Sequence, residues 1–380
     1  MKSNFHSGLL FLKKMNHLKI FLTLFLAISF FSCSHPQNNQ HVGIENIKYS
    51  TVVIDTIYIA IENSSFSGFS GVIDNSLYFF DEFFSFYYPI SIEGNIGKRS
   101  LGLGNAPYEI PIRGPLEVCF SNNNSFIVMG GSNDAYIYEQ MNNRRRLGMI
   151  AHGEKESYES PAAYTIWPEV IMRSYGDHFF YNVIGNNESV DPVTKNDYFK
   201  SAHLLMKVDL NSGEMEPVGN YSDYYVTNRN KLKHLPMVYY DIDNKGNFYV
   251  TFQADSLIYV YNRKFDLIKC MGYQGKNMDI DYSNPNPDEN SFEKAYLHDM
   301  QEKGYYYWIK NINELTMRIY QKGAHAHNDG MQIYQGNDLI ADIVVPKGFK
   351  VIGYVSPYFV TQVICDEDNE TMKFYRFKLE

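Results

Sequence analysis

The feature that most constrains the fold is a repeated alternation of polar turns with short segments of aromatic and β-branched residues. It begins near His41 and continues to the end of the chain. Turn residues 74–76 precede the apolar segment 77–80, and Gly246-Asn247 precede residues 248–250 in the same way. Strands this short, separated by regular turn signals, predict an all-β fold, either a sandwich or a radial repeat.

Residues 240–272 form the clearest unit of this repeat. Polar turns are predicted at 243–247, 254–256 and 262–264, and strand-forming segments fill the intervals between them. Three turns that link successive antiparallel strands make a four-stranded meander, which is the unit of a β-propeller blade.

Helix-forming segments are few, because 16% of the chain is aromatic and these residues favour strands. The one predicted helix lies near residues 290–303. Asn290 is its expected N-cap, with Glu293 three residues later and Gly304 as the C-cap. Its apolar stripe consists of Phe292, Tyr296 and Met300. We expect this helix to lie on the propeller as a lid or a brace.

The C-terminal end supplies strands only at 358–364 and 373–379, which is too few for a four-stranded blade. The early segment 52–61 has strand composition and is the expected donor of the missing strand, since closure removes the free sheet edges. We therefore predict a single propeller domain over residues 43–380, with six four-stranded antiparallel blades. A ring of seven blades is the alternative.

The N-terminus has the order of a bacterial signal peptide. Lysines precede the apolar run 20–31, which ends at Ser32 and Cys33. The run is too short to span a bilayer, which takes about 20 apolar residues. We therefore expect residues 1–32 to be a cleaved leader that starts at Met1 or Met15. Residues 33–42 would form a polar tether. A cysteine that directly follows a small residue here resembles a lipobox, which implies acylation of Cys33.

The charge of the chain excludes one class of partner. The first 32 residues carry four lysines and no acids, so their removal changes the charge from 34 − 43 = −9 to 30 − 43 = −13. Such an acidic body is repelled by nucleic acid and by anionic lipid. We expect the remaining cysteines to be buried free thiols, because they are odd in number and widely spaced; they are Cys119, Cys270 and Cys365.

Taken together, these features resemble a known group of proteins. The leader, Cys33, a Tyr- and Phe-rich body and the blade at 240–272, which is similar to NHL-type blades, resemble the uncharacterised six-bladed β-propeller lipoproteins of Bacteroidetes. The glycine-rich segment 102–107 and Leu147-Gly148 resemble the ends of such blades. The resemblance implies the fold and an outer-membrane location, but it brings no activity and no catalytic residues.

His325, His327 and Asp329 form the sharpest polar cluster in the sequence. In an extended segment the three side chains share one face, and imidazole with carboxylate suits Zn, Mn or Fe. Asn328-Asp329-Gly330 is also a turn signature, and further ligands are missing nearby. We therefore expect a loop, with no bound metal and no cofactor.

Two further sets of residues are candidates for ligand binding or modification. Trp167 and Trp308 are the only tryptophans, and each is either a stacking platform for a ligand or a core residue. Thr56 and Ser256 each lie between an aspartate and an aliphatic residue. That triplet resembles the general O-glycosylation site of Bacteroidetes, which implies a sugar on these hydroxyls.

The predicted function is that of a lipid-anchored binding or scaffolding module in the cell envelope, for a carbohydrate, a peptide or an envelope protein. Propeller sites are assembled from loops that are remote in sequence, and this explains why no local motif appears. The alternative is a metal-dependent propeller enzyme, either a lactonase or a glycan lyase or hydrolase. Whether the protein is an enzyme stays open, and we favour the non-catalytic module. Residues 34–40 lack the acidic cluster that resembles a surface-export signal, so we expect an outer-membrane lipoprotein that faces the periplasm.

Overall fold

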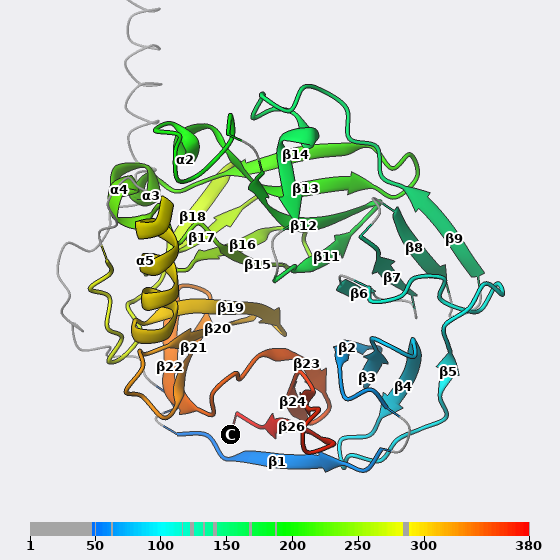
Figure 1. Cartoon of the computed structure of the whole chain (residues 1–380). Helices are drawn as coiled ribbons and strands as arrows, with labels where there is room; N and C mark the ends of the chain where they lie inside the picture. Colours follow the sequence, from blue (N-terminus) through cyan, green and yellow to red (C-terminus); the bar gives the residue numbers. More distant parts are fainter. Residues whose placement is uncertain are drawn as a thin grey trace, which may run out of the picture. The chain divides into compact units, whose positions relative to one another are not determined.

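A computed structural model describes residues 48–49, 51–61, 64–115, 117–121, 125–131, 134–139, 143–166, 169–186, 188–283 and 289–379. In these ranges the strands form six antiparallel sheets that are arranged around a common centre (Figure 1). The predicted fold, an all-β propeller with six blades of four antiparallel strands, is confirmed.

The blades follow one another along the chain, each from its innermost to its outermost strand. The first blade contains β2 (Gly68–Ile73), β3 (Ser76–Asp81), β4 (Phe86–Ile90) and β5 (Ser100–Leu101). The second contains β6 (Glu117–Ser121), β7 (Ser125–Met129), β8 (Asp134–Glu139) and β9 (Asn143–Gly148). In the third, both β10 (Tyr164–Ile166) and β11 (Met172–Tyr175) pair with β12 (His178–Gly185), followed by β13 (His203–Asp209) and β14 (Met215–Asn220).

The fourth blade is the meander predicted from the sequence. It contains β15 (Val238–Ile242), β16 (Phe248–Phe252), β17 (Ile258–Tyr261) and β18 (Leu267–Met271). The fifth contains β19 (Tyr305–Ile312), β20 (Leu315–Gln321), β21 (Asp329–Gln335) and β22 (Asp338–Val345). The sixth contains β23 (Val351–Val355), β24 (Tyr358–Thr361), β25 (Ile364–Asp366) and β26 (Thr371–Phe377).

The ring is closed by β1 (Ile54–Ile59), which comes from the other end of the chain. This strand pairs with β26 over its whole length, from Ile54 opposite Phe377 to Ile59 opposite Met372. It is therefore the outermost strand of the sixth blade, as the sequence predicts. The pairing covers an edge of β26 that would otherwise be open to other strands.

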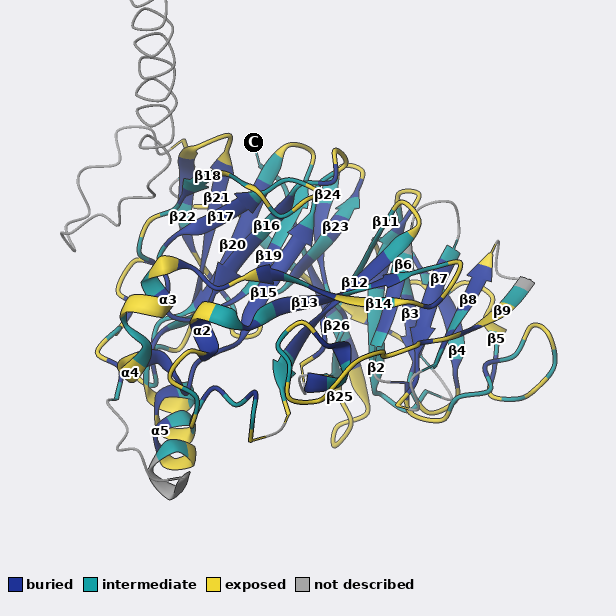
Figure 2. Cartoon of the chain, turned by 90° about the horizontal axis from the view of Figure 1, so that it is seen from above, coloured by how far each residue is buried: buried dark blue, intermediate teal, exposed yellow. Residues whose placement is uncertain are grey.

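Aromatic side chains fill the space between neighbouring blades. Phe126 stacks on Tyr138 with ring centroids 4.7 Å apart, and on Tyr87 of the first blade at 5.4 Å. These rings belong to a buried cluster that also contains Phe80. The strand interiors are accordingly buried, and exposure is concentrated in turns and in α5 (Figure 2). The high content of Tyr and Phe thus supplies the packing between sheets.

The predicted helix is present as α5 (Glu289–Glu302), which begins one residue earlier than the expected N-cap. Its inward face contains Phe292, Tyr296 and Met300, together with the buried residues Ala295 and Asp299. Four further helical segments occur that the sequence did not predict: η1 (Pro161–Ala163), α2 (Tyr198–Ser201), α3 (Asp223–Thr227) and α4 (Arg229–Leu232). Each is only three to five residues long, so it lacks the periodicity that identifies a helix.

Two cysteines agree with the expectation of free thiols. Cys119 is buried and Cys365 is half-buried, and both are free. Cys270 is half-buried as well.

Candidate functional site

The innermost strands of all six blades surround a cavity of about 650 Å³. Residues from β2, β6, β11, β15, β19 and β23 line it, as does the segment 362–367 that leads into β25. These inner strands contact one another in order around the ring. We call this cavity the central channel. Most of the lining residues lie in the first half of an inner strand or just before that strand. The mouth of the channel therefore lies at the end where the inner strands begin.

Several inner strands place one charged residue inside an otherwise apolar sequence. Glu117 begins β6, Arg173 lies in β11, Asp241 lies in β15 and Lys310 lies in β19. Because the innermost strand of each blade faces the ring centre, these residues meet although they are far apart in sequence. The result is a charged belt within the channel.

Asp241 is the centre of this belt. Its Oδ1 accepts hydrogen bonds from Arg173 Nε at 2.8 Å and from Lys310 Nζ at 3.0 Å. Its Oδ2 accepts one from the backbone N–H of Asn311 at 2.8 Å. The carboxylate side chain is 2% exposed, so these interactions act away from bulk water. One negative charge is therefore shared by two positive charges from different blades.

Trp308 projects into the same channel, which is where a stacking residue would be useful. Its indole Nε1 donates to the backbone carbonyl of Val351 at 2.7 Å, which fixes the ring. The guanidinium of Arg173 lies 5.2 Å from the ring centroid, and the ammonium of Lys350 lies 5.4 Å from it. Both distances are within the range of cation–π attraction. Trp308 is thus half-buried beside two cations.

The channel changes the protonation of the groups inside it. Burial raises the pKa of Glu117 to about 7, although the nearby charges of Arg173 and Lys350 act in the opposite direction. Burial likewise lowers the pKa of Lys310, against the attraction of Asp241. Burial also raises the pKa of the Cys119 thiol, which makes it a poor nucleophile. Perturbed ionisable groups that gather in one cavity are typical of a functional site.

The mouth of the channel is more exposed and more acidic than its interior. Glu169 and Glu367 line it and are exposed. The hydroxyl of Tyr239 donates to Glu169 at 3.4 Å. Tyr296 of α5 lies close enough that, after burial, the Glu169 charge is the second cause of its raised pKa. The charge of Glu169 thus acts on both Tyr239 and helix α5.

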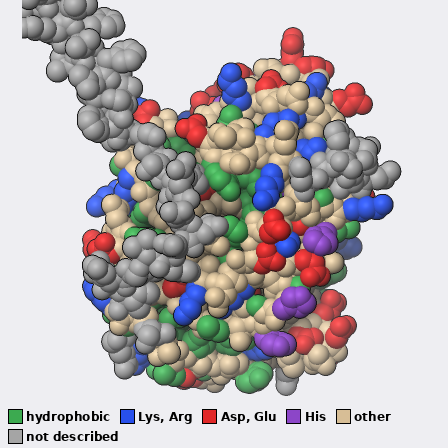
Figure 3. Space-filling view, turned by 90° about the vertical axis from the view of Figure 1, so that its left-hand side faces the viewer, with side chains coloured by type: hydrophobic (Ala, Val, Ile, Leu, Met, Phe, Trp, Pro, Cys, Tyr) green, Lys and Arg blue, Asp and Glu red, His purple; other side chains and the backbone are tan. Residues whose placement is uncertain are grey.

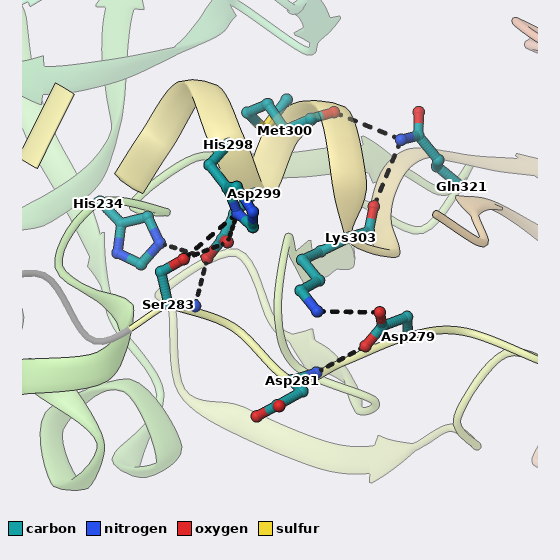
Figure 4. A network of polar contacts seen from close by, with 9 residues as sticks. All are labelled: His234, Asp279, Asp281, Ser283, His298, Asp299, Met300, Lys303 and Gln321. Carbon is teal, nitrogen blue, oxygen red and sulfur yellow. Dashed lines mark hydrogen bonds and ion pairs between the residues drawn. The ribbon is translucent and has the colours of Figure 1, made fainter. Parts of the chain in front are cut away.

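A buried carboxylate holds α5 in place (Figure 4). Asp299 Oδ2 lies 2.8 Å from His234 Nε2 and accepts the backbone N–H of Ser283 at 2.7 Å. Its Oδ1 accepts Ser283 Oγ at 2.6 Å and lies 3.0 Å from His298 Nδ1. Burial tends to raise the pKa of Asp299, but these hydrogen bonds outweigh it and hold the pKa well below its usual range. The helix is therefore fastened as a brace. The carboxylate, not a histidine, is at the centre, so this is not the arrangement of a catalytic triad.

The structure separates the members of the predicted polar cluster. His325 and His327 are exposed in the loop before β21, whereas Asp329 is buried at the start of that strand. The Asp329 carboxylate accepts hydrogen bonds from Tyr307 Oη at 2.7 Å and from the Gly348 N–H. Among the described residues no three His, Cys, Asp or Glu side chains are grouped so that they could hold a metal ion.

The candidates for modification lie in different surroundings. Thr56 is exposed on β1, at the outer edge of the sixth blade. Ser256 is half-buried in the turn before β17, and its carbonyl accepts a hydrogen bond from Arg318 Nη1 at 2.9 Å. Cys33 and Trp167 lie outside the described residues. On the face shown in Figure 3, Lys, Arg, Asp and Glu side chains are dispersed, histidine side chains gather at the lower right, and hydrophobic ones form only small separate areas.

Among the described residues, Trp308 is the stacking candidate from the sequence that reaches the channel. Sequence reasoning missed Glu117, Arg173, Asp241 and Lys310. A signal for them exists, since each is the single charged residue in the strand that faces the channel in its blade. It becomes visible only when the strands are assigned to blades.

Comparison with known proteins supports the fold. The chain is similar to the crystal structure of a member of the DUF4221 family from Bacteroides vulgatus, with a TM-score of 0.57 and 13% identity over 87% of this chain and 98% of that one. It is also similar to a Bacteroides fragilis protein whose name marks it as a candidate for export, with a TM-score of 0.52 and 12% identity over 87% and 95%. At such identities the likeness shows the fold alone.

No protein-family model and no curated protein matches the chain. In the described part of the chain, no helix is both long and apolar enough to cross a membrane.

Proposed function

We propose that this protein is a lipid-anchored binding module of the cell envelope and that the central channel is its ligand site. The observation that carries the proposal is the channel itself. It is a cavity of about 650 Å³ to which all six blades contribute, with a tryptophan and several charged groups inside. Its volume lies in the range of small-molecule sites, roughly 300–1,000 Å³.

The energetic cost of the charged belt supports a role in binding. Removing Arg173, Lys310 and Asp241 from water costs free energy, and well-packed apolar side chains often stabilise a fold as well or better. The packing between the blades is apolar and aromatic, so the fold has no evident need of charges at its centre. A site for a polar ligand accounts for them.

The envelope location rests on the leader and on Cys33, with support from the name of the Bacteroides fragilis relative. A lipoprotein cysteine carries two or three acyl chains, and that number gives stable anchoring whereas one chain does not. The protein would then be held at the inner face of the outer membrane.

The anchor is tested by Cys33→Ala. The wild-type protein should sediment with membranes and take up a palmitate analogue, whereas the variant should be soluble and unlabelled. A wild-type protein that takes up no label and fractionates with soluble periplasmic proteins contradicts the lipid anchor.

The ligand site is tested with a single-tryptophan variant. Trp167→Phe keeps only Trp308 as a reporter inside the channel, and N-acetyltryptophanamide in the same buffer is the control for effects on emission that do not involve the site. Small molecules extracted from envelopes should change the emission of the variant saturably and leave that of the control without a saturable change. No saturable change in the variant, or an equal change in the control, contradicts binding in the channel.

A further inference from the structure

The interior of the channel carries positive charge although the protein as a whole is acidic. The chain has 34 basic and 43 acidic residues, for a net charge of −9. Three cations nevertheless face the channel, namely Arg173, Lys310 and Lys350. The carboxylates beside them are Asp241, which binds Arg173 and Lys310, and Glu117, which lines the channel.

Asp241 does not neutralise both of its cationic neighbours. Asp241 offers one negative charge to both Arg173 and Lys310. One positive charge is therefore left over. Arg173 also retains unused donors, because only its Nε and Nη1 make hydrogen bonds in the described part of the chain.

Lys350 is the second source of uncompensated charge. Its ammonium lies 5.4 Å from the centroid of the Trp308 ring and makes no hydrogen bond or ion pair with any described residue. The charge of Lys350 acts on Glu117, but burial raises the pKa of Glu117 to about 7. Glu117 is therefore a weaker counter-charge near neutral pH than an exposed carboxylate would be. The space beside Trp308 thus favours a negative charge.

We infer that the channel binds a small organic acid with a single carboxylate, placed between Arg173 and Lys350, while the body of the ligand packs against Trp308. A guanidinium matches a carboxylate through two parallel N–H donors, and the indole face supplies apolar contact area. The exposed carboxylates of Glu169 and Glu367 at the mouth disfavour a ligand with several negative charges. This inference rests on the proposed ligand site and adds the chemical class of the ligand.

The experiment uses the Trp167→Phe protein and two matched pairs of probes. Benzoate is compared with benzamide, and glucuronate is compared with glucose, so that each acid has a neutral partner of similar shape. The two acids should change Trp308 emission saturably and should bind at least about tenfold more tightly than their partners, equivalent to about 1.4 kcal/mol. Added salt should weaken the acids and leave the neutral probes unaffected.

A variant pair identifies the cation that is responsible. Lys350→Met should weaken both acids at least about fivefold because a charge-assisted contact is lost. Lys347→Met, which changes an exposed lysine of the same turn outside the channel lining, should leave the affinities unchanged. Circular dichroism and thermal unfolding check that both variants are folded.

The outcomes separate this inference from the proposed function. Neutral probes that bind as tightly as the acids, or acids that are insensitive to Lys350→Met, overturn the inference and leave the channel as a ligand site. If none of the four probes changes Trp308 emission, the inference is overturned as well, and the envelope-extract test alone then decides the proposed function.

Discussion

The seam that closes the ring and the channel at its centre both join distant parts of the chain, but different interactions form them. At the seam, six residues of β1 pair with β26, and Ile59 lies in an apolar cluster with Phe374 and Met372. In the channel, side chains from different blades meet mainly through charges, with Asp241 shared by Arg173 and Lys310.

The difference indicates which region stabilises the fold and which serves a ligand. Pairing a sheet edge and burying isoleucine remove polar backbone and apolar surface from water together, and both effects favour folding. Burying charges costs desolvation, which the ion pairs only partly offset. Changes at the seam should therefore act on stability, and changes in the channel should act on binding.

The largest effect is expected from deletion of the chain up to Ile61. Loss of β1 exposes the edge of β26 and the apolar surface that Ile57 and Ile59 cover. Ile59 is buried and Ile57 is partly buried, so together they correspond to roughly 2–4 kcal/mol of unfolding free energy. Urea unfolding should measure it, with a deletion that stops before residue 48 as the control. An unchanged melting temperature would contradict closure by β1.

The next effect is expected at Asp299, the carboxylate that fastens helix α5. Asp299→Asn should lower the unfolding free energy by about 2–4 kcal/mol near neutral pH, because His234 and Ser283 lose a buried charged acceptor. The folded pKa of Asp299 lies below its unfolded value, so the carboxylate stabilises above about pH 4 and less as the pH falls further. The deficit of the variant should therefore shrink in acid.

His298→Ala is the matched control for that carboxylate. His298 also contacts Asp299, but its side chain is 55% exposed. Its loss should cost no more than about 1 kcal/mol. A cost equal to that of Asp299→Asn would contradict the central role of the carboxylate.

A smaller effect of the opposite sign is expected from Glu117→Gln. The folded pKa of Glu117, about 7, is above the unfolded value, so protonation favours the folded state and this contribution is lost as the pH rises through 7. The variant should therefore be more stable than the wild type at pH 8, by on the order of 1 kcal/mol, and equal to it below about pH 4. Thermal unfolding across this range provides the measurement. A pH-independent difference would show that Glu117 is ionised in the channel throughout.

The smallest effect on stability is expected from Lys350→Met. Its ammonium has no ion pair among the described residues, so the unfolding free energy should change by less than about 0.5 kcal/mol. Urea unfolding measures this change. A loss of several kcal/mol would mean that Lys350 is a structural residue, and it would remove the contrast between seam and channel.

The sequence predicted the architecture because its signals are local. The turn at 243–247 and the strand that follows it belong to one meander, and the pattern of 290–303 identifies α5 without reference to the rest of the chain. The donor strand 52–61 could be found because the last blade lacked a strand. Each of these inferences uses residues that are close in sequence or a simple count of strands.

The site could not be predicted in the same way. Arg173, Asp241 and Lys310 come from three successive blades, and their meeting depends on the register of each inner strand. Trp308 was a candidate only as a rare residue, while the local cluster of His325, His327 and Asp329 drew attention although its members point to different environments. Proximity in sequence was misleading here, since the ring gathers residues by their position within each blade.

The pairing of β1 with β26 also determines when folding of the protein can be completed. The first strand to be synthesised must wait for the last one, so the sixth blade is completed only when the whole chain is available. A chain cut short before β26 leaves the first strand without its partner and an inner sheet edge open. Such incomplete chains are open to proteases, and closure of the ring thus distinguishes a full-length molecule from a fragment.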